Sequence, residues 1–171
     1  VLASGEPISV HAVSGYSGGG RSLIERFQMQ ALEGVDHLWH ARPYALGLDH
    51  KHLPEMARYA ALEQPPLFSP MVDHYYKGML VQMPLFAERL ACRLDPQALT
   101  DLLAERYAEE ACINVVRPDG RAALTEGFLD PEACNGTNRV DLMVFGDAER
   151  MLLVARLDNL GKGASGAAVQ N

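Results

Sequence analysis

Hydrophobic and polar positions alternate in short runs along much of the chain, which is the pattern of β-strands with one buried face. In residues 8–13, for example, Ile8 and Val10 alternate with Ser9 and His11. This alternation, together with short apolar runs, predicts strands at residues 8–13, 37–46, 68–72, 79–85, 113–116, 139–145 and 151–158. Pro43 favours a sheet edge for the second of these, because proline cannot donate a ladder hydrogen bond.

Helices are predicted between several of these strands. Apolar residues spaced by three and four positions indicate a helix over 22–33 that ends at Gly34. Pro54 suits the first turn of a short helix to about residue 62. Asp95, as an N-cap before Pro96, opens a third helix to about residue 110. The predicted inward positions of this third helix are Leu99, Leu102, Leu103 and Tyr107.

Short strands mixed with three or four helices predict an α+β fold, with a mixed and mostly antiparallel sheet and helices on one face. Met79, Val81 and Met83 alternate along one strand and make a sheet face too apolar to lie in water. We therefore expect a docked domain or a second copy of the chain to cover it, as a homodimer or homotetramer formed through the sheet face.

Length and composition indicate one ordinary globular domain over residues 1–171, with 48% hydrophobic and 22% charged residues. Fifteen basic against 22 acidic residues give a net charge of -7, which disfavours nucleic acids and anionic membranes as partners. Three cysteines without a CxxC pair favour a reducing compartment, the cytoplasm. No apolar run reaches the roughly 18 residues of a membrane span. The start at Val1 and the small-residue end predict a fragment of a longer protein.

The glycine-rich segment between the first strand and the first helix is a candidate anion site. It reads Ser14-Gly-Tyr-Ser-Gly-Gly-Gly-Arg21. Glycines allow backbone N–H groups to approach a phosphate at a helix N-terminus, and Ser14, Ser17 and Arg21 add donors. A tight turn that needs flexible residues explains the same pattern equally well.

Two histidines precede the second helix in the segment Asp49-His-Lys-His-Leu-Pro-Glu55. If the chain before Pro54 is extended, His50 and His52 project to the same side. Such a pair could act as a general acid or base near neutral pH, with Glu55 orienting a ring. Solvated histidines at a helix start are the plainer alternative. A metal hydrolase is the weakest one, because no third ligand follows at a metal-binding spacing, and no metal site is expected.

Two further segments offer polar groups. Lys77, just before a strand, could meet an anion or could be a solvated lysine at a strand edge. The segment 158–171 is a strand end followed by small residues, where a ligand or another helix can come close and Gln170 could bond an amide. Cys92 and Cys112 are interpreted as lying in apolar surroundings and Cys134 in a loop, all without a catalytic role.

Taken in order, these four segments resemble the C-terminal half of the N-acetyl-gamma-glutamyl-phosphate reductases, in the shorter of that family's two types. The resemblance implies the fold of the C-terminal domain of glyceraldehyde-phosphate and aspartate-semialdehyde dehydrogenases. It also implies NADPH-dependent reduction of N-acetyl-gamma-glutamyl phosphate to the semialdehyde, with release of phosphate. The family's Asn-Pro-Gly-Cys thiol and dinucleotide fold do not occur in this sequence. We therefore expect the N-terminal NADP-binding half and the extreme C-terminus to be missing, and the fragment alone to be inactive.

The resemblance also implies roles for individual residues. The catalytic histidine, which takes the thiol proton, would be His50, with His52 as second choice and Glu55 holding the ring. The remaining roles are cofactor binding for Ser14, Gly15, Gly163, Ala164 and Gln170, and binding of the acyl phosphate for Ser17, Arg21 and Lys77. The alternative function is a non-catalytic interaction or dimerisation domain of the same fold.

Overall fold

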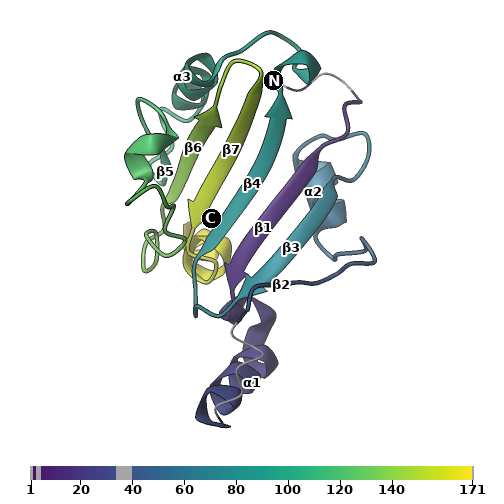
Figure 1. Cartoon of the computed structure of the whole chain (residues 1–171), viewed down its shortest axis with the longest axis vertical. Helices are drawn as coiled ribbons and strands as arrows, with labels where there is room; N and C mark the ends of the chain where they lie inside the picture. Colours follow the sequence, from purple (N-terminus) through teal and green to yellow (C-terminus); the bar gives the residue numbers. More distant parts are fainter. Residues whose placement is uncertain (1, 3–4, 34–39, 171) are drawn as a thin grey trace.

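A seven-stranded mixed sheet forms the body of the protein in the computed structural model, which describes residues 2, 5–33 and 40–170 (Figure 1). The strands are β1 (Ser9–Gly15), β2 (Arg42–Pro43), β3 (Leu67–Asp73), β4 (Met79–Phe86), β5 (Ile113–Val115), β6 (Val140–Gly146) and β7 (Arg150–Leu157). Their order is β2-β3-β1-β4-β7-β6-β5. The pairs β1–β3 and β5–β6 are parallel and the other four are antiparallel, so the predicted mixed and mostly antiparallel sheet is confirmed.

The helices are α1 (Gly20–Glu33), α2 (Leu53–Tyr59), α3 (Pro96–Arg106) and α4 (Gly166–Gln170), the last preceded by a π-helical turn at Gly161–Ser165. Short 3₁₀ turns occur at Tyr16–Gly19, Ala87–Arg89 and Gly120–Ala123. The predicted N-cap of α3 is confirmed, because the Asp95 carboxylate accepts a 2.8 Å hydrogen bond from the Ala98 amide.

The helices α2 and α3 cover the same face of the sheet. Leu53 and Met56 of α2 pack with the cluster of Val10, Ala12 and Phe68, to which Met79 and Val81 also belong. Leu99 of α3 packs with Leu85, Val144 and Met151, against which Met83 also lies. The chain's own helices therefore lie on the face of Met79, Val81 and Met83, for which a docked domain or a second copy was expected. An alternating pattern identifies the two faces of a strand, but it does not say which face the chain's own helices cover.

The opposite face has its own small core. Leu80, Met143 and Val154 are buried there, packed against Val116, Ala123 and Leu129. The Gly120–Ala123 turn therefore belongs to the segment that shields the β4–β7–β6 part of this face. Over β1 and β3 the same face stays more open, with His11 exposed and Leu67 50% exposed.

Two predicted elements differ from the observed ones. Helix α1 covers the predicted residues, but it protrudes beyond the lower end of the sheet in Figure 1. Only part of its predicted apolar stripe is therefore covered: Phe27 is buried against Tyr16, while Leu32 stays exposed. Residues 37–39 of the predicted strand 37–46 lie outside the described residues, and only β2 pairs with β3, at the predicted sheet edge.

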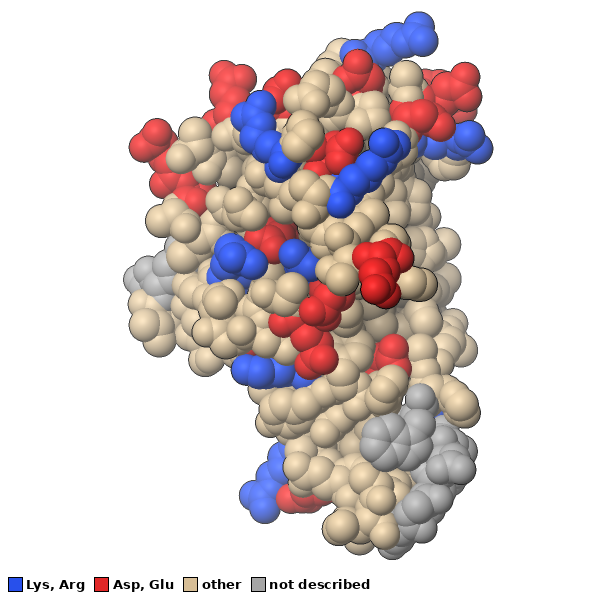
Figure 2. Space-filling view, turned by 60° about the vertical axis from the view of Figure 1, so that its left-hand side comes forward, with Lys and Arg blue, Asp and Glu red and all other residues tan. Residues whose placement is uncertain are grey.

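Charged side chains of both signs are interspersed over the face that Figure 2 shows, without a large area of one sign. On that face the basic side chains therefore form no continuous patch that could attract an anionic partner against the net charge of -7. Among the described residues, the helices are too short or too polar to cross a membrane.

Candidate functional site

The glycine turn after β1 lies against the turn that carries Lys77. The amide of Gly15 donates to the Gly78 carbonyl at 2.9 Å, and the amide of Ser17 donates to the Tyr76 carbonyl at 3.0 Å. A Cβ added to Gly15 would lie 2.6 Å from the Tyr76 carbonyl oxygen. Glycine is therefore required at this position because two backbone segments approach closely, whether or not an anion binds nearby.

Asp158, at the end of β7, holds three segments together with one buried carboxylate. Its side chain is 1% exposed and accepts hydrogen bonds from the amides of Leu160 and Gly161 at 2.9 Å and of Gly136 at 2.8 Å. The Lys77 ammonium lies 3.3 Å from Oδ2. Burial alone would raise the pKa of this carboxyl, but the backbone and lysine donors outweigh it and the pKa is lowered.

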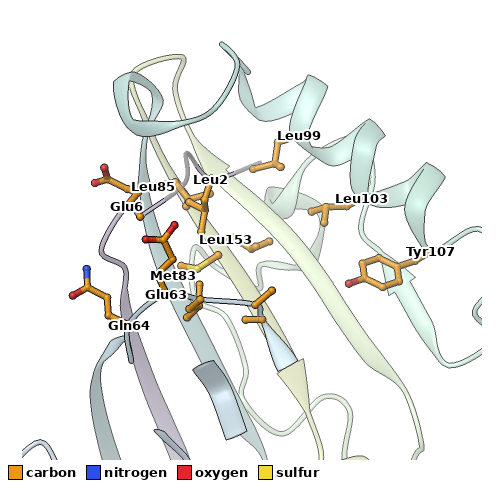
Figure 3. A pocket seen from close by; sticks show the side chains of 14 residues that line it. Leu2, Glu6, Glu63, Gln64, Met83, Leu85, Leu99, Leu103, Tyr107 and Leu153 are labelled. Atoms are coloured by element: carbon orange, nitrogen blue, oxygen red, sulfur yellow. The ribbon is translucent and has the colours of Figure 1, made fainter. Parts of the chain in front are cut away.

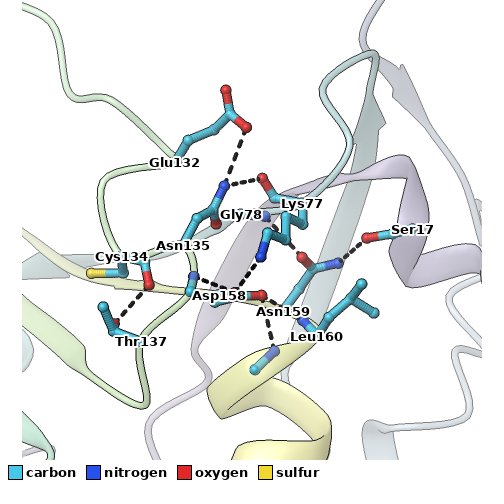
Figure 4. A network of polar contacts seen from close by, with 12 residues as sticks. Ser17, Lys77, Gly78, Glu132, Cys134, Asn135, Thr137, Asp158, Asn159 and Leu160 are labelled. Carbon is cyan, nitrogen blue, oxygen red and sulfur yellow. Dashed lines mark hydrogen bonds and ion pairs between the residues drawn. The ribbon is translucent and has the colours of Figure 1, made fainter.

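Asn159 and Asn135 complete this arrangement, which Figure 4 shows. Asn159 accepts from the Gly78 amide at 2.8 Å and donates to the Ser17 hydroxyl at 3.2 Å, while Asn135 donates to the Lys77 carbonyl at 2.8 Å. We call the set Ser17, Lys77, Gly78, Asn135, Gly136, Asp158 and Asn159 the Asp158 cluster. It brings together three of the four segments singled out in the sequence.

Sequence reasoning did not assign roles to Asp158, Asn159 or Asn135. The available signal was the polar pair Asp158-Asn159 placed directly between a strand and a glycine turn. Side chains of Asp and Asn that follow a strand can form hydrogen bonds with the backbone of the neighbouring turns. Asn135 stood in a segment interpreted only as a turn, and nothing local to it indicates a contact with Lys77.

A small pocket of about 340 Å³ opens beside the Asp158 cluster, lined by Lys77, Asp158, residues 136–138, Leu160, Gly161, Ser165 and Gly166. Two of the small residues here, Gly161 and Gly166, allow neighbouring segments to pack closely. A Cβ on Gly161 would lie 3.0 Å from the Thr137 carbonyl, and one on Gly166 would collide with the Asn138 side chain. Gly163 and Ala164 differ from these two glycines because they are exposed. The side chain of Gln170 lies outside the described part of the structure.

The remaining residues of the glycine turn have different surroundings. Ser14 is 7% exposed and points to the α2 side of the sheet, while Ser17 is 2% exposed. The Arg21 side chain is 91% exposed and pairs with Glu25 one helical turn later, at 2.6 Å. Arg21 is therefore not brought to the Asp158 cluster in this structure, although the turn that precedes it is.

His50 lies at the start of α2, against β3. Its ring packs edge-on against Phe68 with 5.0 Å between ring centroids, and it lies near Tyr44. Partial burial, together with the neighbouring His52 and Lys51, lowers the pKa of His50. The lowered pKa favours the neutral form of the ring at pH 7. Its Nδ1 accepts from the His52 amide at 3.2 Å, so the N–H of the neutral ring is at Nε2.

The two histidine rings lie side by side, with 4.8 Å between their centroids. The backbone between them is not extended as predicted. His52 has helical dihedral angles (φ -84°, ψ -7°) and α2 already begins at Leu53, so a turn brings the rings together. Glu55 is exposed and makes no hydrogen bond to either ring among the described residues. The segment before a proline is usually extended, but Pro54 here falls in the first turn of a helix that tolerates it.

His50 and the Asp158 cluster lie at different positions along the sheet. His50 contacts Phe68, whereas Ser14 of the glycine turn is paired with Val72 on the same strand. Four residues of strand separate these positions, about 13 Å at about 3.3 Å per residue. A single small ligand in contact with both would have to extend along β3.

A larger apolar groove lies away from these residues, on the part of the helix-covered face between α2 and α3 (Figure 3). Its volume is about 560 Å³, and Leu99 and Leu103 of α3 face Met83 and Leu153 of the sheet across it. None of the site residues predicted from the sequence lines it. We therefore do not assign catalysis to it.

The cysteines do not form a reactive site. Cys92 is exposed rather than in apolar surroundings as predicted, Cys112 is half-buried, and Cys134 is fully buried with its thiol donating to Asp141 at 3.3 Å. Burial and the contact with Asp141 raise the pKa of the Cys134 thiol, although Arg139 opposes the shift. Within the described residues, no group of three or more His, Cys, Asp or Glu side chains is placed to hold a metal ion.

The chain resembles known proteins over its full length. A family model described as "Semialdehyde dehydrogenase, dimerisation domain" matches residues 1–159. The chain is 44% identical to N-acetyl-gamma-glutamyl-phosphate reductase 2 of Nostoc sp. and 45% identical to the N-acetyl-gamma-glutamyl-phosphate reductase of Allorhizobium ampelinum. Each match covers 100% of this chain and 55% of the relative, so the chain spans about half the length of these proteins.

Solved structures with the same fold include aspartate semialdehyde dehydrogenases. Aspartate semialdehyde dehydrogenase II from Vibrio cholerae matches with a TM-score of 0.68 at 14% identity, over 99% of this chain and 54% of that one. A probable aspartate-semialdehyde dehydrogenase from Pseudomonas aeruginosa matches with a TM-score of 0.67 at 17% identity, over 96% and 53%. At these identities the likeness shows the fold, and it agrees with the fold expected from the sequence.

Proposed function

Because the chain belongs to the semialdehyde dehydrogenase dimerisation-domain family, we propose that it is the C-terminal part of an N-acetyl-gamma-glutamyl-phosphate reductase. The whole enzyme would reduce N-acetyl-gamma-glutamyl phosphate to N-acetyl-L-glutamate 5-semialdehyde with NADPH and release phosphate, as a step of arginine biosynthesis. The observation that carries this proposal is the 44–45% identity to such reductases over the entire chain. A missing N-terminal half would supply the NADP-binding fold and the nucleophilic thiol, and the enzyme would work in the cytoplasm.

A nicotinamide cofactor fits one of the two places named from the sequence. Gly163 and Ala164 are exposed and carry little side chain, so a flat ring can come close to their backbone. Gly15 fits less well, because its amide is already bonded to Gly78, and Ser14 is buried beside it. We therefore assign cofactor contact to Gly163 and Ala164 rather than to Ser14 and Gly15. The bound nicotinamide would supply the hydride.

His50 is our proposed proton-transfer group. As a neutral ring with its N–H at Nε2, it can donate a hydrogen bond to the oxyanion of a tetrahedral intermediate, and it becomes a proton donor only after Nδ1 has taken up the thiol proton. It can take a proton from the thiol only when Nδ1 is released from the His52 amide, because Nδ1 holds the free lone pair. Lys77, kept in place by Asp158, would offer a positive charge to the substrate anion.

The test is the complete polypeptide with His50→Asn. We expect kcat for NADPH oxidation with the acyl phosphate to fall by about 10²–10⁴, with an unchanged circular dichroism spectrum. His52→Asn is the matched control and should cost less. In the parent, kcat/KM should decline as the pH falls through a value below 6.5, because protonation removes the neutral ring. Unchanged turnover in His50→Asn would overturn this role for His50, and a complete polypeptide without reductase activity would favour the non-catalytic interaction domain instead.

A further inference from the structure

We propose that Asn159 is a positioning residue for this reaction, which fixes the Lys77 turn and the glycine turn relative to each other. This inference rests on the proposed function. Asn159 is the second residue after β7 and contacts two segments that are distant in sequence, Gly78 at a separation of 81 residues and Ser17 at 142 (Figure 4). An amide side chain has both an acceptor and a donor in one plane, so it can bond both at once.

One bond of Asn159 acts on the residue next to Lys77, and the other acts on Ser17. The Gly78 amide, which donates to Asn159 at 2.8 Å, belongs to the residue that follows Lys77. The Lys77 carbonyl is held from the other side by Asn135. Lys77 is thus fixed by its backbone at two points before its ammonium meets Asp158. A lysine stem is flexible, so anchoring the backbone limits where its charge can be.

The glycine turn is fixed in a similar way. The Ser17 hydroxyl accepts from Asn159, and the Ser17 amide donates to Tyr76 in the Lys77 turn. A Cβ on Gly18 would lie 3.2 Å from the Asn159 amide nitrogen, so the turn packs tightly on this side chain. Releasing Asn159 would therefore loosen both turns without removing a group that touches substrate. Small errors in position can cost a reaction up to about 100-fold in rate.

The function of Asn159 can be separated from that of Asp158. Asp158 carries a buried charge with four donors, so its loss affects the fold. Asn159 is half-buried and uncharged, so Asn159→Leu should leave most of the stability in place. Asn114→Leu is the matched control, because it removes one side-chain hydrogen bond, to Asp141, outside the Asp158 cluster.

The experiment measures NADPH oxidation by the complete polypeptide with N-acetyl-gamma-glutamyl phosphate. We expect Asn159→Leu to raise KM for the acyl phosphate about tenfold. In a Lys77→Met background the same change should do little, because the group that Asn159 positions is gone. Asn114→Leu should leave KM unchanged. Asn159→Asp keeps the acceptor for the Gly78 amide and should raise KM less than Asn159→Leu does.

The outcomes are distinguishable. If the parent is active and Asn159→Leu has parental kinetics, or if its effect multiplies with that of Lys77→Met, the positioning role is overturned and the proposed function stands. An inactive parent overturns both. Unfolding followed by circular dichroism shows whether Asn159→Leu is folded, and where it is not, Asn159→Asp replaces it in the same cycle with Lys77→Met.

Discussion

Asp158 shows how one residue can stabilise the protein in a pH-dependent way. Its carboxyl has a lowered pKa in the folded protein, because four donors outweigh the opposing effect of burial. A carboxyl whose folded pKa lies below its unfolded value of 3.8 stabilises the fold above that value. This stabilisation is lost as the pH falls toward the folded pKa. We expect the urea midpoint of unfolding to drop as the pH is lowered below about 4, and to drop less in Asp158→Asn.

At pH 7, Asp158→Asn should lower the free energy of unfolding by about 2–3 kcal/mol, the cost of losing a charged acceptor from buried hydrogen bonds. Asp147→Asn is the control, because Asp147 also accepts from two turn amides but is exposed. Its effect on the urea midpoint should be clearly smaller. Equal losses for the two variants would show that burial of Asp158 contributes nothing.

The cysteines give a second prediction at the residue scale. Burial and the bond to Asp141 raise the pKa of Cys134, whereas Cys92 is exposed. Iodoacetamide at pH 8 should therefore modify Cys92 in the native protein and leave Cys134 unmodified until urea unfolds it. Peptide mapping by mass spectrometry after timed quenching measures both rates. Native labelling of Cys134 as fast as Cys92 would contradict the buried placement.

Helix α3 allows a test of packing at the scale of an element. Leu99 is 1% exposed and belongs to the core with Leu85 and Val144, while Leu102 on the same helix is 37% exposed. Leu99→Ala should therefore cost about 3 kcal/mol of unfolding free energy in urea titration, because it leaves a cavity. Leu102→Ala should cost less than about 1 kcal/mol. Similar losses would mean that α3 is rotated from the described orientation.

The same helix shows what sequence patterns can and cannot specify. The start of α3 was predicted correctly, because an N-cap and a first-turn proline act locally. Leu102 was predicted inward and is exposed, because a helix with several leucines has more than one apolar stripe. Strands β4 and β7 were predicted to within about one residue, since alternation is also a local property. Which face of β4 the helices cover depends on the whole chain and could not be predicted.

In the candidate site, too, local features could be predicted from the sequence and long-range contacts could not. The motifs themselves could be recognised in the sequence, and three of them do meet in the Asp158 cluster. The contacts that join them could not be predicted, because Asn159 bonds residues 81 and 142 positions away. The approach of His50 to His52 was predicted, but for the wrong backbone, since the helix begins one residue before Pro54.

At the scale of the whole molecule, the sheet face opposite α2 and α3 is the surface we propose for pairing with a second copy. His11 and Pro84 are exposed there, and Leu67 is 50% exposed, so substitutions at the edge of this face should spare the core. The proposal keeps the expected contact through the sheet but moves it to the face that the helices leave open. The family model, which is described as a dimerisation domain, supports pairing but does not specify the face.

Introducing a carboxylate on this open face should separate the two copies. A two-fold interface places the same patch of both subunits together, so Leu67→Glu or His11→Glu brings like charges close to each other in the pair. Light scattering on the complete polypeptide should give twice the chain mass for the parent and the mass of one chain for either variant. Tyr59→Glu is the control, because Tyr59 is 82% exposed on α2, on the other side of the sheet, and it should leave the mass doubled. A parent of single-chain mass, or glutamate variants that stay paired, would exclude this face as the interface.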